Sequence, residues 1–245
     1  MIAGIPTYVE ESGGGPTVFY LHGATEWIGY ADEFTRLLAA RFRVVQAERR
    51  GHGRTPDVPG PLTYEAMTAD TIALIEHLDC GPAHIVGFSD GGIIALLLAL
   101  ARPDLVDRIV AIGPNARVDG LTDETLTWLA EVTPETWPSE CSEAYARLSP
   151  DGPGHWPTVC RKVVEMLLRE PDIAADDLAR ITAPTLLIGG DRDVVRSDHF
   201  LEMHRAIPGS QLCILPGASH EIPTEEPARA SELTTRFLEE STSGG

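Results

Sequence analysis

The chain has 245 residues, of which 43% are apolar and 23% charged, a composition typical of a globular protein with a sizeable hydrophobic core. Its net charge of −18 argues against a surface for nucleic acid or anionic membranes, because both need clustered Lys and Arg. No apolar run approaches the roughly 20 residues of a transmembrane helix.

The N-terminus and the cysteines indicate the expected compartment. The first six residues have neither a basic segment nor a long apolar run, so we predict no signal peptide and a cytoplasmic protein. The cysteines form no C-x-x-C pair and no histidine stands at zinc-ligand spacing, so we expect free thiols and no metal site. They are Cys80, Cys141, Cys160 and Cys213.

Strand-like and helix-like segments alternate through the first 115 residues. Short apolar stretches predict strands over residues 7–10, 17–21 and 42–47. Amphipathic patterns predict one helix that ends near residue 40 and another over 63–78. The loops at 22–30 and 48–55 follow predicted strands, so we expect them at the carboxyl edge of the sheet, where ligands bind.

The stretch from Ile85 to Leu100 consists of an apolar strand, a sharp turn and an apolar helix. Ser89 stands in the turn, with Gly87 and Gly91 two residues to either side. A serine held there with positive φ brings its neighbours together, so only small residues fit. The G-x-S-x-G pattern is typical of a nucleophile elbow, and a plain turn with a capping serine is the alternative.

Residues 116–181 show no strand-like alternation, only helical segments divided by prolines. We therefore predict one α/β domain, residues 1–115 and 182–245, interrupted by a helical insertion over 116–181. Trp128, Trp137 and Trp156 lie in the insertion, and Trp27 lies in the loop after residue 23. These rigid rings either line an apolar substrate pocket or fill the insertion's own core.

The alternation resumes after the insertion. The pattern predicts strands over 185–188 and 211–215, helices over 198–206 and 227–240, and disorder for Ser241 to Gly245. The fold class is therefore α/β, with a mostly parallel sheet of about seven or eight strands covered by helices on both faces.

Two residues near predicted strand ends complete a catalytic set with Ser89. Asp193 and His220 follow it in the chain order of one known class of triad. His220 would accept the Ser89 proton, and an acid would orient the imidazole and stabilise its protonated form. Spacing alone does not separate Asp193 from Asp191, which also suits a turn. His22, His52, His199 and His204 are the other candidate histidines.

Five motifs in order resemble those of α/β-hydrolase fold enzymes, over nearly the whole chain outside the insertion. The resemblance implies this fold, a triad with Asp193 as the acid, no cofactor, and a cap formed by the insertion. The motifs are Leu21-His22-Gly23, Arg50-Gly51-His52-Gly53-Arg54-Thr55, Gly87-Phe88-Ser89-Asp90-Gly91-Gly92, Gly190-Asp191-Arg192-Asp193 and Gly217-Ala218-Ser219-His220.

The same resemblance implies that the backbone N–H groups of Ala24 and Asp90 form the oxyanion hole, and that His22 and His52 hold loops. No further glycine follows Gly23, so an H-G-G-G type of hole is absent. Glu48 stands where many similar enzymes have aspartate, a change that we expect to affect loop packing only.

A serine nucleophile leaves acyl transfer as the expected chemistry, on a small-molecule substrate. We expect a cofactor-free serine hydrolase of small carboxylic esters or lactones. C–C bond hydrolases and cofactor-free haloperoxidases or perhydrolases use the same triad, and a slow or non-catalytic ligand-binding or biosynthetic protein is the alternative of another class. The elbow is similar to that of valacyclovir-hydrolase-like esterases, so Asp90 either binds a substrate ammonium or bonds neighbouring loops.

Overall fold

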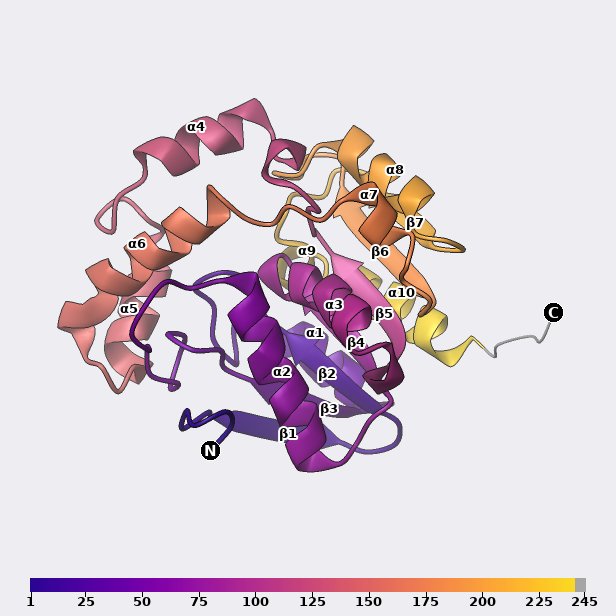
Figure 1. Cartoon of the computed structure of the whole chain (residues 1–245), viewed down its shortest axis with the longest axis horizontal. Helices are drawn as coiled ribbons and strands as arrows, with labels where there is room; N and C mark the ends of the chain where they lie inside the picture. Colours follow the sequence, from indigo (N-terminus) through magenta and orange to yellow (C-terminus); the bar gives the residue numbers. More distant parts are fainter. Residues whose placement is uncertain (241–245) are drawn as a thin grey trace.

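The computed structural model describes residues 1–240, and the disorder predicted for Ser241 to Gly245 falls outside the described residues. Within that range the strands form a seven-stranded sheet in the order β1-β3-β2-β4-β5-β6-β7 (Figure 1). Strand β1 pairs antiparallel with β3, and the other pairs are parallel, which confirms the predicted sheet. The strands are β1 (Val9–Gly13), β2 (Thr17–Leu21), β3 (Arg43–Ala47), β4 (Ala83–Phe88), β5 (Val106–Ile112), β6 (Thr185–Gly190) and β7 (Gln211–Leu215).

Helices cover both faces of the sheet, as the alternation predicts. Helices α2 (Tyr64–Leu78), α3 (Asp90–Ala101) and α8 (Ser197–Ala206) pack on one face, and α1 (Asp32–Ala39) and α10 (Pro227–Glu239) pack on the other. The short helices η1 (Pro103–Leu105) and α9 (Ile222–Glu225) complete this part of the fold.

The two faces explain the sequence of the central strand. In β4, Ile85 belongs to the core beneath α2 and α3, whereas Val86 belongs to the core beneath α1 and α10. A parallel strand that is buried on both faces needs apolar residues at successive positions. The strand before Ser89 is therefore a continuous apolar run and not an alternating one.

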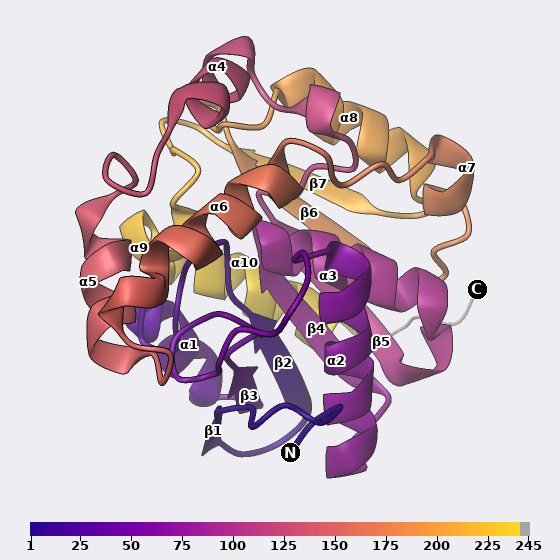
Figure 2. The same ribbon diagram turned by 60° about the vertical axis from the view of Figure 1, so that its left-hand side comes forward.

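The segment between β5 and β6 consists of helices in the structure and lies over one edge of the sheet (Figures 1 and 2). Trp137 Nε1 donates to Thr25 Oγ1 at 3.1 Å, and Lys162 Nζ donates to Asp57 Oδ2 at 2.6 Å. Since Thr25 and Asp57 follow β2 and β3, these helices cover the carboxyl edge. They are η2 (Val118–Gly120), α4 (Asp123–Glu131), α5 (Ser139–Leu148), η3 (Pro153–His155), α6 (Trp156–Leu167) and α7 (Ala175–Leu178).

No helix in the described part of the chain combines the length and the apolar character that crossing a membrane requires.

Candidate active site

Ser89 occupies the junction between β4 and α3 in a strained backbone conformation. Its φ is 51° and its ψ is −117°. A Cβ added to Gly87 would lie 2.1 Å from the carbonyl oxygen of Gly91, and one added to Gly91 would lie 2.0 Å from that of Leu21. Both positions therefore require glycine, as the elbow pattern indicates, and the turn places Ser89 at the N-terminus of α3.

His220 and Asp193 follow β7 and β6 and meet Ser89 at the carboxyl edge of the sheet. His220 Nε2 lies 3.0 Å from Ser89 Oγ, and His220 Nδ1 lies 2.6 Å from Asp193 Oδ1. The backbone N–H of Gly190 donates to Asp193 Oδ2 at 3.3 Å, and that of Val195 donates to Oδ1 at 3.1 Å. The structure thus brings the three side chains into one chain of hydrogen bonds, held at its acidic end by backbone amides.

The other candidate acid, Asp191, is exposed and takes part in a different contact. Its Oδ1 accepts the backbone N–H of Gly217 at 2.7 Å, which joins the loops after β6 and β7. The role considered for it is to form a local turn, whereas this contact links two separate loops. Asp193, by contrast, is buried and bonded to His220.

The charge of Asp193 sets the protonation behaviour of His220. Burial is the largest single effect and opposes protonation of the imidazole, but the nearby carboxylates, Asp193 first among them, together raise the pKa of His220 above its ordinary value. Glu221, the next residue, adds to this effect, and its own pKa is raised by burial. The phenol of Tyr30 donates to Glu221 Oε2 at 3.2 Å. His220 is therefore a stronger base than an isolated histidine.

The four other candidate histidines are engaged elsewhere. The Nδ1–H groups of His22 and His52 donate to the carbonyl oxygens of Gly23 and Arg50, the loop-holding role expected of them. In α8, His199 Nε2 accepts the N–H of Ala116, and His204 lies beside Ser210. Burial and the nearby Arg49 lower the pKa of His52 to about 3, so its imidazole is neutral.

The two amides of the predicted oxyanion hole lie at loop and helix ends. Asp90 begins α3, where the N–H has no partner within the helix. Across residues 1–240, neither this N–H nor that of Ala24 donates a hydrogen bond to another part of the chain. Both donors are therefore available to a ligand oxygen.

The side chain of Asp90 is committed to its neighbours. Its carboxylate is fully buried, and Oδ1 accepts the hydroxyl of Tyr64 at 2.7 Å. Arg49 Nη2 lies 3.8 Å from Oδ2. Burial raises the pKa of this carboxyl, and Arg49 and Tyr64 oppose the increase. Of the two roles considered for Asp90, bonding to neighbouring loops is the one that this geometry supports.

The tryptophans divide between a small cavity and the packing around it. Trp27 and Trp156 line a cavity of about 10 Å³ beneath the inserted helices, together with His52. Trp137 is buried against Thr25, and Trp128, whose accessible fraction is 42%, lies with its ring centroid 5.2 Å from that of Trp137. Trp128 and Trp137 therefore lie outside this cavity.

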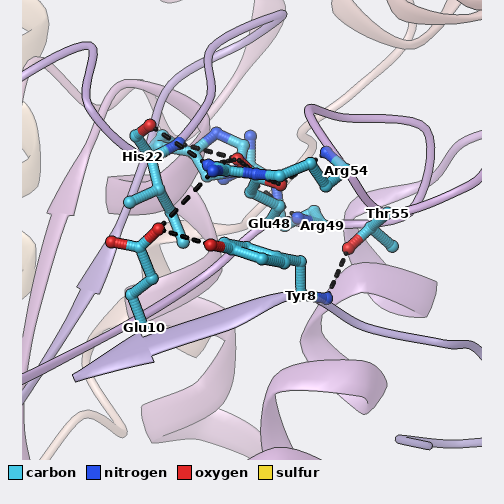
Figure 3. Close-up of polar contacts among 8 residues, drawn as sticks. Tyr8, Glu10, His22, Glu48, Arg49, Arg54 and Thr55 are labelled. Carbon is cyan, nitrogen blue, oxygen red and sulfur yellow. Dashed lines mark hydrogen bonds and ion pairs between the residues drawn. The ribbon is translucent and has the colours of Figure 1, made fainter. Parts of the chain in front are cut away.

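Glu48 joins the two loops that flank the site (Figure 3). It is fully buried, accepts the N–H of Ile28 at 3.1 Å, and pairs with the Arg54 guanidinium, which in turn lies 3.8 Å above the Tyr8 ring. A Cβ on Gly53 would collide with the Glu48 carboxylate, at 2.2 Å from Cδ. The expected effect of Glu48 on loop packing is visible in these contacts.

Three polar residues of the site have no role in the sequence prediction. Glu26 Oε2 accepts the N–H of Gly23 at 2.7 Å, and Arg49 and Tyr64 contact Asp90. An acid three residues after Gly23 is a weak signal for such a contact. Nothing in the sequence distinguishes Arg49 from Arg50, which instead pairs with Asp70.

In the described part of the chain, His, Cys, Asp and Glu side chains form no cluster of three or more that could hold a metal ion.

Comparison with known proteins places this geometry in a family. The profile of the Alpha/beta hydrolase family matches residues 18–233. The sn-1-specific diacylglycerol lipase ABHD11 of Mus musculus is 29% identical over 91% of this chain and 81% of its own length, and the putative carbamate hydrolase RutD of Agrobacterium fabrum is 29% identical over 91% and 93%. An enol-lactonase from Burkholderia xenovorans shares the fold, with a TM-score of 0.78 over 98% of both chains at 21% identity. Since the family match spans most of the sequence, the chain belongs to the alpha/beta hydrolase family.

Proposed function

We propose that this protein is a serine hydrolase that cleaves small carboxylic esters or lactones through an acyl-enzyme intermediate. The observation that carries the proposal is the unbroken chain from Ser89 Oγ through His220 to Asp193. A serine hydroxyl is a weak nucleophile at neutral pH, and an adjacent base with its own orienting acid is the arrangement that activates it.

The proposed reaction begins with attack of Ser89 Oγ on the substrate carbonyl carbon. His220 Nε2 takes the serine proton as the new C–O bond forms, and the carbonyl electrons move to the oxygen. The amides of Ala24 and Asp90 donate to that oxyanion. As the intermediate collapses, His220 returns the proton to the leaving alkoxide, and water then releases the acid from Ser89 by the same steps in reverse order.

Asp193 contributes through His220 and does not itself take the proton. Its carboxylate binds Nδ1–H, so Nε2 is the nitrogen with the free lone pair, and it stabilises the imidazolium that forms in each half of the reaction. The two backbone amides that donate to Asp193 hold the carboxylate in place.

We assign the inserted helices, within residues 116–181, as a cap over the substrate site. The cavity lined by Trp27 and Trp156 has space for about one water molecule, and Ser89 and His220 are not among its lining residues. We therefore expect the cap to move when an acyl group binds next to Ser89. The aromatic lining favours an apolar acyl or alcohol portion. Two relatives, named as a diacylglycerol lipase and a putative carbamate hydrolase, are consistent with a substrate that has a carbonyl group.

A substrate panel tests the proposal. p-Nitrophenyl esters of increasing acyl length, simple lactones and amino-acid esters are assayed with the wild type and with Ser89→Ala. Turnover by the wild type and a loss on the order of 10⁶ in kcat for Ser89→Ala are expected, because a triad acts as a unit. Residual activity within about tenfold of the wild type would remove Ser89 as the nucleophile.

Labelling with a fluorophosphonate separates a hydrolase from a ligand-binding protein of the same fold. The reagent phosphonylates an activated serine, so the wild type is expected to label and Ser89→Ala is not. A folded wild-type chain that neither labels nor turns over any member of the panel would favour a binding role and overturn the proposal.

A further inference from the structure

Arg49 lies in the loop after β3 and contacts Gly23 and Asp90, the residues next to and bearing the two amides assigned to the oxyanion hole. Its side chain is 5% exposed, and its guanidinium donates through Nη1 to the carbonyl of His22 and through Nη2 to that of Gly23, the latter at 2.8 Å. Figure 3 shows Arg49 beside His22. No step of the proposed reaction uses this side chain directly.

The contact with Gly23 fixes the direction of the Ala24 N–H. The Gly23–Ala24 peptide is trans, so its C=O and its N–H point in opposite directions. The carbonyl oxygen is held by Arg49 Nη2 and by His22 Nδ1, both at 2.8 Å. The Ala24 N–H must therefore point away from Arg49. If the guanidinium were lost, one of the two restraints on this peptide would be lost with it.

The other donor residue is held by the same guanidinium. Asp90 supplies its backbone N–H, and its side chain lies between the Tyr64 hydroxyl at 2.7 Å and Arg49 Nη2 at 3.8 Å. Among the described residues, Asp90 Oδ2 has no hydrogen-bond partner, so Arg49 is its nearest compensating charge. One buried cation thus contacts both residues that carry the proposed donors.

Arg50, the next residue in the same loop, does not make the contacts that Arg49 makes. Its guanidinium makes a bidentate pair with Asp70, with both distances 2.7 Å, and contacts neither Gly23 nor Asp90. The two neighbouring arginines therefore have separate partners, one in the site and one on α2, and Arg50 offers a matched control.

From these contacts we propose that Arg49 is a positioning residue that aligns the two halves of the oxyanion hole, by holding the Gly23 carbonyl on one side and the Asp90 carboxylate on the other. The proposal rests on the proposed function for its kinetic consequence. Arg49 acts only through the two amides, because it contacts the Gly23 carbonyl and the Asp90 carboxylate and not the reacting atoms.

The main test variant is Arg49→Met combined with Asp90→Asn, because removal of one charge alone would leave the other buried and unpaired. In a protein with wild-type circular dichroism, kcat for p-nitrophenyl acetate is expected to fall roughly 10- to 100-fold, less than the 10²- to 10³-fold loss of a whole donor, while KM stays within about threefold. Arg49→Lys keeps the charge and can reach one carbonyl, so its kcat is expected to lie between those of the wild type and the double variant. Arg50→Met is expected to leave kcat within about threefold.

An inhibitor pair distinguishes alignment of the donors from general loosening of the structure. A trifluoromethyl ketone adds the Ser89 hydroxyl and places an oxyanion in the hole, whereas the matching methyl ketone binds largely as the neutral ketone. The proposal is supported if the double variant loses affinity for the trifluoromethyl ketone in proportion to its loss of kcat/KM and keeps its affinity for the methyl ketone. Equal loss for both compounds, or an unchanged kcat in the folded double variant, overturns it.

A crystal structure of the double variant tests the alignment without any substrate. We expect the Gly23–Ala24 peptide of the double variant to be rotated or to adopt two orientations. A peptide in the wild-type orientation would overturn the proposal, whatever kcat the variant has. Ester turnover by the wild type decides the proposed function separately, so failure of one inference is not mistaken for failure of the other.

Discussion

His220 Nδ1 lies 2.6 Å from Asp193 Oδ1, whereas the carboxylate of Asp191, two residues earlier, accepts the N–H of Gly217. Asp193→Asn is therefore expected to lower kcat by about 10⁴, because the amide favours the wrong imidazole tautomer. Asp191→Asn is the matched control and should cost far less. Steady-state kinetics on one p-nitrophenyl ester checks both, and the reverse ranking would exchange the two assignments.

The raised pKa of His220 predicts where activity falls on the acid side. Only the neutral imidazole can accept the Ser89 proton, so kcat/KM decreases as the pH drops through the pKa of His220. Since the Asp193 carboxylate raises that pKa, the midpoint is expected above about 6.5, the ordinary value for histidine. In Asp193→Asn the residual activity should show a midpoint at lower pH. A wild-type midpoint below about 6 would contradict this interpretation of the site.

The burial of Asp90 predicts that it does not select substrates with an amine. Asp90→Asn keeps a side chain that can accept from Tyr64 and removes only the charge. We expect kcat/KM to fall by the same factor for the p-nitrophenyl esters of alanine and of propanoic acid. A loss confined to the alanine ester would show that the carboxylate binds the ammonium group after all.

A half-buried cluster between the loop after β3 and the inserted helices predicts a contribution to stability. Lys162 Nζ donates to Asp57 Oδ2 at 2.6 Å and to the carbonyl of Val58 at 2.7 Å, and His155 Nε2 lies 2.8 Å from the same Asp57 oxygen. Lys162→Met leaves this carboxylate short of a partner and should lower the free energy of unfolding by about 2 kcal/mol.

Urea unfolding measures that loss, and Arg180→Met is its control. Arg180 pairs with Asp177 on the surface at 2.9 Å, with both side chains largely exposed, so its removal should change the free energy of unfolding by less than about 0.5 kcal/mol. Equal effects of the two substitutions would mean that the cluster around Asp57 adds no more than a surface pair.

The elbow could be predicted from sequence because its requirements are local. A Cβ at Gly87 or Gly91 would collide with nearby backbone atoms of the turn and of β2, so both glycines stand at fixed spacing from Ser89. The order of Ser89, Asp193 and His220 can likewise be seen directly in the sequence. By contrast, β1 runs over Val9–Gly13 and not over 7–10, because its limits are set by pairing with β3, as in the register of Gly13 with Arg43.

The supports behind the site could not be predicted in the same way. Arg49 reaches Asp90 from the loop after β3 and Tyr64 from the start of α2, and the tertiary fold alone brings these three side chains together. Arg49 and the half-buried Arg50 are adjacent arginines, and the sequence does not show which of them is buried in the site. The choice between the two roles of Asp90 therefore depended on contacts that only the structure contains.

The backbone of Ser89 has a consequence for selection. A serine with φ of 51° and ψ of −117° lowers the stability of the folded state by about 1–3 kcal/mol. Glycine at this position would remove most of that strain, but its greater freedom in the unfolded chain would cost about 0.5–1 kcal/mol of stability. The molecule is thus less heat-resistant with serine at this position than it would be with glycine, because the serine Cβ causes the strain. A screen of random variants for heat resistance alone would enrich Ser89→Gly, so directed evolution of this protein has to select for turnover in the same round.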